Sequence, residues 1–278
     1  MAQSSGQDPA VLREQAYADD RCLDIRRRTH QVYSVEPIDF GRWTLERLAW
    51  RGDERVLDVG CGPGDLLVRM ADWQQGWDIL VGFDFSPGMI AEAFERASGV
   101  RVHFFAGDAQ QIPFSDGTFD VVMARHMLYH VPDIDRAVAE AARVLRTDGR
   151  ILVTTNSLQT MAEIRALRAQ AVAQFPGMAP VADLTSRFTV ENAPAYLEPY
   201  FERLQTHVLP GVLRFPTAGP FMDYFASSRA LLMRRTHTDA EWQAVLDFVR
   251  GEAESIVARQ GRLDVTKCTG AIVGVKRG

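Results

Sequence analysis

Residues 55–155 predict a doubly wound α/β fold built on a mostly parallel sheet. Short runs that are apolar throughout alternate along this stretch with longer segments of helical periodicity. Strands that are apolar on both faces belong to a sheet with helices on each side, which is typical of parallel sheets. The first apolar run also ends in a glycine-rich turn that leads into a helical segment. This arrangement favours a ligand site at the ends of the strands.

The elements of this region follow in regular order. Strands are expected at Val56–Val59, Ile79–Phe83, Val102–Phe105, Phe119–Ala124 and Arg150–Thr155. Helices are expected between them at Asp65–Trp73, Pro87–Ala97 and Ile134–Leu145, and the turn Thr147-Asp148-Gly149 closes the last one. One helix therefore separates most pairs of strands, as a parallel sheet requires.

The flanking segments are predicted to be mainly helical. Residues 11–50 have helical periodicity with a break near Ser34–Asp39. Later helices are expected at Leu158–Gln174, Asn192–Tyr200, Ala218–Met233 and Asp239–Arg259, with an irregular connection over Pro176–Thr189. Two strand pieces around Pro210-Gly211, within Leu204–Phe215, and a final strand at Gly270–Lys276 complete the sheet. We therefore expect a helical segment at 1–50, a ligand-binding core at 51–156, and the rest of the sheet with a helical cover at 157–278.

Composition narrows the class of protein. The chain has 278 residues, 46% of them hydrophobic, and a formal net charge of −5, which is ordinary for a soluble globular protein. It has no sustained run of Lys and Arg, so nucleic acid is not an expected partner. The N-terminus lacks a signal-peptide pattern and no apolar run is long enough to span a membrane. We expect a cytoplasmic protein without a membrane partner.

Three cysteines, Cys22, Cys61 and Cys268, lie far apart and in no metal-ligand spacing. Reduced thiols in the cytoplasm fit this pattern best. We therefore expect neither a disulfide nor a bound metal. Cys61 is expected to fill space in its loop rather than to act as a nucleophile.

The turn after the first strand is the most informative stretch. It reads Gly60-Cys61-Gly62-Pro63-Gly64. Glycines allow a tight turn and let a ligand lie against bare backbone, and the helix that follows offers free N–H groups. A dinucleotide fingerprint needs a third glycine three residues after the second, where this chain has Asp65. The spacing therefore disfavours a nicotinamide cofactor.

Together with four later motifs, this turn resembles the class I S-adenosylmethionine-dependent methyltransferases. Their first motif is similar to the run containing Asp58, Gly60, Gly62 and Gly64. Further matches follow in order at Phe83-Asp84-Phe85-Ser86, Gly107-Asp108-Ala109, Phe119-Asp120-Val121-Val122, and Arg143-Val144-Leu145 with Gly149-Arg150. The resemblance covers about residues 50–156. It implies a Rossmann-like sheet of seven strands and S-adenosyl-L-methionine as the cofactor.

The resemblance also implies roles for the acidic residues. Asp84 would accept hydrogen bonds from the ribose hydroxyls, Asp108 from the adenine amino group, and Asp58 would hold the methionine amino group directly or through water. Carboxylates suit these roles because each ligand group is a donor. Met89 and Ile112 are candidates to flank the adenine ring, and ordinary core packing is the alternative for both. The remaining predicted cofactor-binding residues are Cys61, Phe85, Ser86, Ala109 and Arg125, the last through its backbone.

The end of the fourth strand is the predicted acceptor site, because ligands in such sheets sit at the carboxyl ends of the strands. His126 and His130 lie there, and histidine has a suitable pKa for a general base. If this stretch is helical, the two histidines share one face. His130 matches the His-His-Val or Leu-His-Val segment of many small-molecule methyltransferases, with Tyr129 in place of the first histidine. Tyr129 is a candidate to contact the acceptor or to support the residues that do. His130 either contacts the acceptor or orders the loop, and the sequence leaves both roles open.

A long excursion near the C-terminus predicts a cover over this site. The family's sheet usually ends in a tight hairpin, but here about 50 residues separate the last two expected strands. Helices in this excursion would close a pocket around a small molecule, and His30 and Tyr33 could contribute from the N-terminal helix. We therefore expect in-line methyl transfer to oxygen, nitrogen or carbon of a small-molecule acceptor. The alternatives are an RNA or protein methyltransferase, which needs a basic groove, and a cofactor-binding protein without catalysis.

Overall fold

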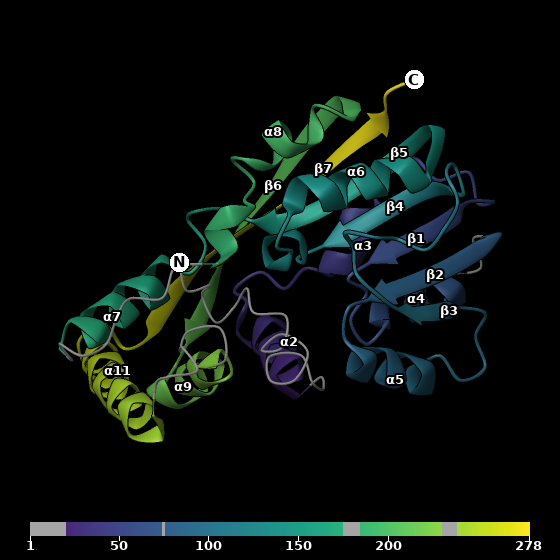
Figure 1. Ribbon diagram of the computed structural model, residues 1–278. Helices are drawn as coiled ribbons and strands as arrows, with labels where there is room; N and C mark the ends of the chain where they lie inside the picture. The colour runs from purple at the N-terminus through teal and green to yellow at the C-terminus, as the bar shows by residue number, and fades with distance from the viewer. Residues whose placement is uncertain (1–20, 74–75, 175–183, 230–237) are drawn as a thin grey trace.

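The computed structural model describes residues 21–73, 76–174, 184–229 and 238–278. Their centre is a seven-stranded sheet in the order β3-β2-β1-β4-β5-β7-β6 (Figure 1). Neighbours among β1 to β5 run parallel, and β7 runs antiparallel to both β5 and β6. The expected mostly parallel, doubly wound α/β sheet is therefore confirmed.

The strands are β1 (Arg55–Val59), β2 (Ile79–Asp84), β3 (His103–Ala106), β4 (Phe119–Arg125), β5 (Leu145–Asn156), β6 (Phe201–Phe215) and β7 (Leu263–Lys276). The first four agree with the sequence prediction to within one residue at either end. Strand order reverses between β1 and β4, so the carboxyl ends of these two strands flank the switch point where α/β proteins bind ligands.

Two predicted breaks lie inside continuous strands. The turn Thr147-Asp148-Gly149 is an irregularity within β5, where Asp148 has a φ of +58° and the register against β4 shifts. The expected interruption at Pro210-Gly211 is absent from β6, because both residues stay in register with β7. Since β6 is an edge strand, Pro210 removes no hydrogen bond that the sheet needs.

The helices described are α2 (Arg21–Tyr33), α3 (Phe40–Leu45), α4 (Asp65–Asp72), α5 (Pro87–Arg96), α6 (Ile134–Val144), α7 (Ala162–Ala173), α8 (Ala193–Leu197), α9 (Ala218–Ala226) and α11 (Asp239–Gln260), with 3-10 turns η3 (Leu128–His130) and η4 (Leu184–Arg187). The helix predicted at Leu158–Gln174 begins four residues late, because Ser157 and Thr160 form a turn that bonds to β7. Predictions for residues 11–20, 175–183 and 230–237 fall outside the described residues.

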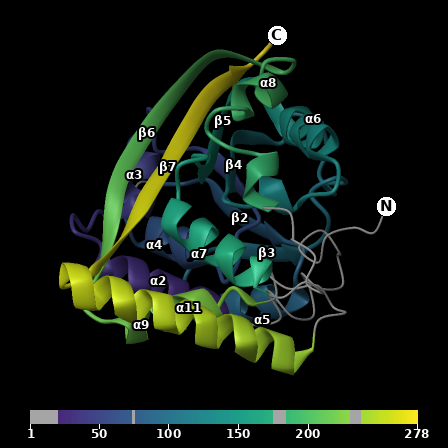
Figure 2. The same cartoon turned by 90° about the vertical axis from the view of Figure 1, so that its left-hand side faces the viewer.

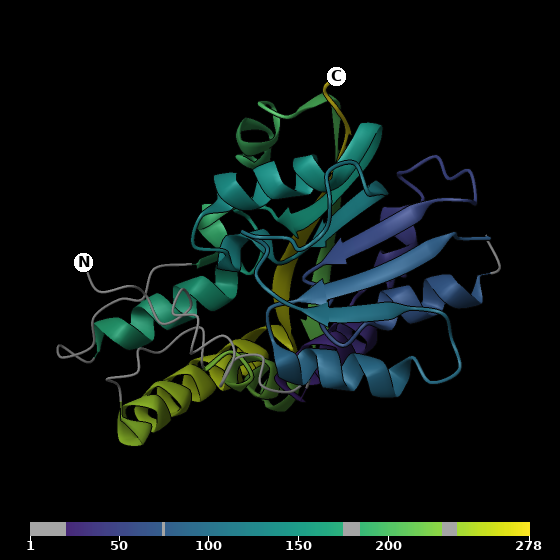
Figure 3. The same ribbon diagram turned by 45° about the vertical axis from the view of Figure 1, so that its right-hand side comes forward.

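Helices cover both faces of the sheet (Figure 3). Alternate residues of β1 show the division: Val56 packs with Leu67 and Met70 of α4, whereas Leu57 packs with the cluster that includes α6. All of these side chains are buried. Burial on both faces explains why the strands are apolar throughout.

A third apolar cluster lies beyond the carboxyl ends of the parallel strands. The ends of β6 and β7 project past the sheet and pack against α7, α9 and α11 (Figures 1 and 2). The rings of Phe225 in α9 and Trp242 in α11 stack there at 5.8 Å. Both helices belong to the connection between β6 and β7, so the expected helical insertion before the last strand is confirmed.

Candidate functional site

The glycine-rich loop between β1 and α4 can be built only with glycine at its key positions. Gly60, Gly62 and Gly64 have φ values of +71°, +56° and +76°. A Cβ on Gly60 would lie 2.6 Å from the Cβ of Met127, and one on Gly64 would lie 2.7 Å from the ring of Phe104. The N–H of Gly60 donates to the carbonyl of Phe83 at 2.7 Å. The loop is thus tied to β2 and keeps its backbone bare toward the space above the sheet.

Asp84 ends β2 beside this loop. One carboxylate oxygen accepts the N–H of Gly62 at 2.9 Å and the other accepts the N–H of Ser86 at 2.8 Å. Burial raises the pKa of Asp84, and the two N–H donors oppose that effect. Each oxygen keeps a lone pair for a ligand hydroxyl. Ser86 itself caps α5 through a bond from the N–H of Met89 at 3.3 Å, which fixes the position of both residues.

Asp108 follows β3 and is held by Gln110, a residue that the sequence analysis missed. The Gln110 side-chain amide donates to both oxygens of Asp108 at 3.0 Å, and its carbonyl oxygen accepts the N–H of Asp133 at 3.1 Å. Gln110 therefore links the loop after β3 to the start of α6. Ile112 lies in the core and is not among the residues that line the cavity described below.

Asp58 is fully buried and forms an ion pair with Arg125 of β4. Arg125 Nη2 lies 2.8 Å from Asp58 Oδ2, and Nε lies 3.4 Å from Oδ1. A buried carboxylate needs such a partner. The pairing leaves Arg125, rather than Asp58, on the cavity wall. Any effect of Asp58 on a ligand therefore passes through Arg125.

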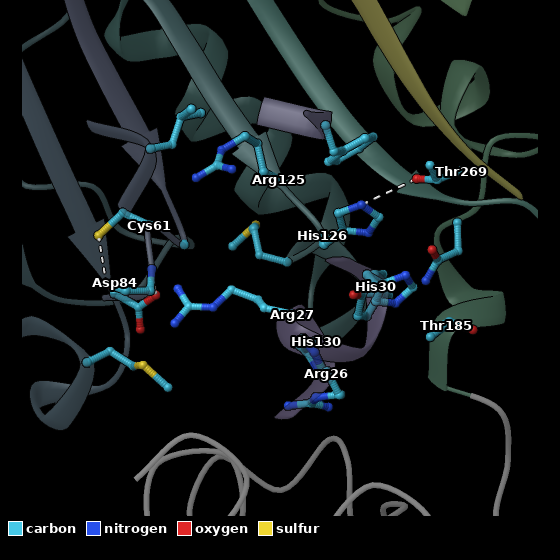
Figure 4. A pocket seen from close by; sticks show the side chains of 18 of the residues that line it. Arg26, Arg27, His30, Cys61, Asp84, Arg125, His126, His130, Thr185 and Thr269 are labelled. Carbon is cyan, nitrogen blue, oxygen red and sulfur yellow. Dashed lines mark hydrogen bonds between the residues drawn. The ribbon is translucent and has the colours of Figure 1, made fainter. Parts of the chain in front are cut away.

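His126 follows β4 in a left-handed conformation, with a φ of +51°. Its N–H donates to the carbonyl of Thr154 at 2.9 Å, and its Nε2 lies 3.4 Å from the hydroxyl of Thr269 on β7 (Figure 4). Because the Thr269 hydroxyl donates its hydrogen bond to the carbonyl of Thr155 at 2.9 Å, it accepts a hydrogen bond from His126 Nε2. This assigns the Nε2–H tautomer and leaves a lone pair on Nδ1. Burial, followed by the charge of Arg125, lowers the pKa of His126 to about 4, so the ring is neutral at pH 7.

Tyr129 and His130 lie in the short turn η3 and also line the cavity. Their rings are 4.6 Å apart, and Tyr129 is largely buried in the core. Arg187 holds this turn from outside by donating to the carbonyls of Tyr129, Val131 and Pro132 at 2.7–3.0 Å. His126 precedes the turn, so the stretch is not one helix, and the condition under which the two histidines would share a face is not met. They reach the cavity from different backbone conformations.

The predicted site residues surround one cavity of about 1070 Å³. It runs from Asp84 and Cys61, past Arg125, to His126 and Thr269 (Figure 4). Of the predicted cofactor-binding residues, all but Asp58 and Gly64 line it, including Gly60, Gly62, Phe85, Met89, Asp108 and Ala109. Burial and the carboxylates of Asp84 and Asp58 raise the pKa of Cys61 well above its usual value, which agrees with a space-filling role.

Helices from three parts of the chain cover the cavity. The covering side chains include His30 from α2, Ile164 from α7 and Tyr224 and Phe225 from α9. His30 Nε2 lies 3.5 Å from the hydroxyl of Tyr224, which joins α2 to α9. Among the described residues of the connection between β6 and β7, only Tyr224, Phe225 and Ser228 line the cavity, and α11 packs behind α9. α7 lies before β6, outside that connection but within residues 157–278, where a helical cover was expected. Tyr33 packs on Phe215 instead of lining the cavity.

Ion pairs connect the N-terminal helices to α4, the helix that follows the glycine-rich loop. Arg27 of α2 pairs with Asp65 at the start of α4, and Asp39 before α3 pairs with Arg69 of α4.

Within the described ranges, no group of three His, Cys, Asp or Glu side chains could hold a metal ion. The same ranges contain no helix that is long and apolar enough to cross a membrane.

Comparisons with known proteins agree with this arrangement. Residues 57–153, from β1 into β5, match a family described as methyltransferase domain. The chain is 37% identical over 148 residues to a demethylmenaquinone methyltransferase of Beutenbergia cavernae, covering 52% of this chain and 60% of that protein. It is 39% identical over 109 residues to the 27-O-demethylrifamycin SV methyltransferase of Amycolatopsis mediterranei, covering 37% and 39%. The matches thus span about 40–60% of the length of these curated relatives.

A solved structure extends the likeness to the whole chain. The [4+2]-cyclase SpnF superposes with a TM-score of 0.60 at 20% identity, covering 100% of this chain and 97% of that one. At this identity the likeness concerns the fold alone. It includes the region after residue 153, where α7, α9 and β7 complete the cavity.

Proposed function

We propose that this chain, whose residues 57–153 match a methyltransferase domain, is a class I S-adenosylmethionine-dependent methyltransferase that transfers the methyl group of that cofactor to a small-molecule acceptor. The observation that carries the proposal is the single cavity of about 1070 Å³ that joins the glycine-rich loop to His126 beneath a helical cover. Ligand pockets generally measure about 300–1000 Å³, so this volume suits a cofactor together with an acceptor.

The residues at one end of the cavity fit S-adenosylmethionine. The loop at Gly60 and Gly62 has no side chains that would exclude the amino-acid part of the cofactor. Asp84 has a free lone pair on each oxygen for a ribose diol, and Asp108 can accept from an adenine amino group. Met89 and Phe85 line the space between these carboxylates and are suited to contact a flat ring. The bound cofactor supplies an electrophilic methyl group on a good leaving group.

The residues at the other end are suited to align an acceptor. Methyl transfer requires in-line placement of the acceptor and exclusion of water. His30, Ile164 and Tyr224 close the space from the cover. A neutral His126, with Nε2–H held by Thr269, can accept a proton or a hydrogen bond at Nδ1 from an acceptor hydroxyl or amine. We propose that His126 orients the acceptor and receives its proton, and that His130 and Tyr129 line the acceptor pocket.

The helical cover over the cavity supports a small molecule over RNA or protein. A macromolecular acceptor needs an open groove, whereas three helices overlie this cavity. The two curated relatives are named for demethylmenaquinone and demethylrifamycin, both small molecules. SpnF, a cyclase of the same fold, illustrates that this architecture alone does not establish methyl transfer.

Turnover therefore has to be tested directly. Purified protein would be incubated with S-adenosylmethionine labelled in its methyl group and a panel of small phenols, quinols, amines and enols. We expect label to move to at least one of them with release of one S-adenosylhomocysteine per methyl. Transfer to RNA or protein in parallel reactions, with none to small molecules, would contradict the proposed acceptor class.

A further inference from the structure

A lysine lies at the covered end of the cavity, outside the region that matches the family. Lys267 is one of only two lysines in the chain, and the other is Lys276. Lys267 lines the cavity from β7, two residues before Thr269 and therefore on the same face of the strand. Asn156, the last residue of β5, pairs with Thr269, so Lys267 extends beyond the end of β5. This places it above the sheet, next to the His126 contact.

Lys267 has no carboxylate partner among the residues that the structure places. Its Nζ donates to the hydroxyl of Ser34 at 3.2 Å, a neutral group at the end of α2. The side chain is half-buried, and burial lowers the pKa of Lys267. An ammonium group removed from water without a counter-charge is unfavourable. The site would therefore gain from a negatively charged ligand group.

Among the described residues, those that line the cavity around Lys267 do not supply that charge, and Glu163 of α7 is engaged by the N–H and the hydroxyl of Thr266. Burial, followed by the charge of Lys267, lowers the pKa of His30 to about 3, so His30 is neutral. The described carboxylates that line the cavity are engaged by other groups: Asp39 by Arg69, Asp65 by Arg27, Asp84 by two backbone N–H groups and Asp108 by Gln110. The helices beside Lys267 contribute further positive side chains to the lining, Arg26 from α2 and Arg165 and Arg168 from α7.

We propose that the acceptor carries an anionic oxygen group, a carboxylate or a phosphate, that pairs with Lys267. This inference rests on the proposed methyl transfer and adds the chemical class of the acceptor. Two residues of a strand span about 7 Å. Pairing at Lys267 would therefore hold the reacting end of a compact acceptor near Thr269 and His126. A lysine provides a point charge for this purpose, so either acid can be recognised.

Matched probes can test the inference without knowledge of the acceptor. Protein saturated with S-adenosylhomocysteine would be titrated with benzoate and benzamide, and with phenyl phosphate and phenol, in calorimetry and thermal unfolding. We expect at least one anion to bind ten-fold or more tightly than its neutral partner and to raise Tm. The pair that shows this preference distinguishes carboxylate from phosphate. Lys267→Met should abolish the preference and Lys267→Arg should retain part of it.

Lys276→Met is the matched control, because Lys276 lies on the same strand but bonds to the carbonyl of Leu145 outside the cavity. It should keep the anion preference of the wild type. Equal binding of anionic and neutral probes, no stabilisation by any anion, or a preference that survives in both Lys267→Met and Lys267→Gln would overturn the inference. Binding of S-adenosylhomocysteine is measured first. If it fails, the proposed function fails; if it is normal and the anion preference is missing, only this inference fails.

Discussion

Arg125 on β4 forms an ion pair with the fully buried carboxylate of Asp58 on β1, with Nη2 2.8 Å from Oδ2. The two strands are neighbours at the switch point of the sheet. The pair therefore joins the first motif of the domain to the strand that leads into His126. It keeps the guanidinium, not the carboxylate, at the surface of the cavity.

Removal of Arg125 should destabilise the protein strongly. Arg125→Met leaves the carboxylate of Asp58 buried without its partner, and such a change costs about 3–5 kcal/mol. Denaturant unfolding would measure it, and the double variant Asp58→Leu with Arg125→Met should recover much of the loss. Arg42→Met, which removes the exposed pair with Glu46, should change stability little. Additive losses in the double variant would show that the two side chains do not act as a pair.

Gly60→Ala should weaken cofactor binding by more than ten-fold. The new Cβ would lie 2.6 Å from Met127, and alanine would also have to adopt a φ of +71°. Because Met127 follows His126, the clash would disturb both ends of the cavity. Calorimetry with S-adenosylhomocysteine would detect it. Gly219→Ala is the control, since nothing lies within 4 Å of its added Cβ, and it should bind normally. Normal affinity in Gly60→Ala would mean that the loop does not contact the cofactor.

Much of this loop was predictable from sequence, because the requirement is local. A glycine-rich turn with an apolar strand before it and a helix after it can be recognised from the sequence. The next two strands are also short apolar runs, so their ends place Asp84 and Asp108. The hydrogen-bond partners of those residues were harder to predict from the sequence. Gln110 is an ordinary polar residue in a loop, and its bridge between Asp108 and Asp133 depends on how distant elements pack.

The covered end of the cavity was predictable only in outline. The long connection before the last strand predicted helices, but which helix reaches the cavity depends on packing among α7, α9 and α11. The contacts of Thr269 and Lys267 arise because β7 inserts antiparallel between β5 and β6, a relationship that local patterns do not encode. The conformation of His126 was likewise missed, since a φ of +51° in a histidine has no sequence signal.

Replacing His126 should slow methyl transfer without loss of the cofactor. If His126 receives the acceptor proton, His126→Gln should lower kcat by about 10²–10⁴-fold, the usual contribution of a general base. Affinity for S-adenosylhomocysteine should stay within about two-fold. The exposed His103 on β3 provides the control variant His103→Gln, which should leave both quantities unchanged. A parallel fall of rate, cofactor affinity and stability in His126→Gln would instead indicate that the residue orders the loop.

Acid should destabilise the ligand-free protein through His30 and His126, two partly buried histidines that line the cavity. The folded-state pKa values of His30 and His126 are about 3 and about 4, below the ordinary value of 6.5. At a pH between 6.5 and these lower values, each histidine is protonated in the unfolded chain and neutral in the folded protein. The free energy of unfolding should therefore fall as pH drops below about 6.5, by up to about 1.4 kcal/mol per pH unit for each histidine.

Denaturant unfolding between pH 4.5 and 7 would measure this slope. Each of the variants His30→Gln and His126→Gln should lower this slope by the contribution of roughly one proton taken up on unfolding. The control variant His103→Gln should leave the slope unchanged. An unchanged slope in both cavity variants would contradict the assignment of these rings as neutral groups in the folded protein.

Calorimetric binding of S-adenosylhomocysteine tests the central claim most directly. We predict one site per chain in the wild type. Asp84→Ala should lose about 1.5–3 kcal/mol of binding free energy, the range for hydrogen bonds to a charged group, because the ribose hydroxyls lose their acceptor. Asp72→Ala, an exposed change at the end of α4, should bind as the wild type does. Binding of NADH without binding of S-adenosylhomocysteine would contradict the account as a whole.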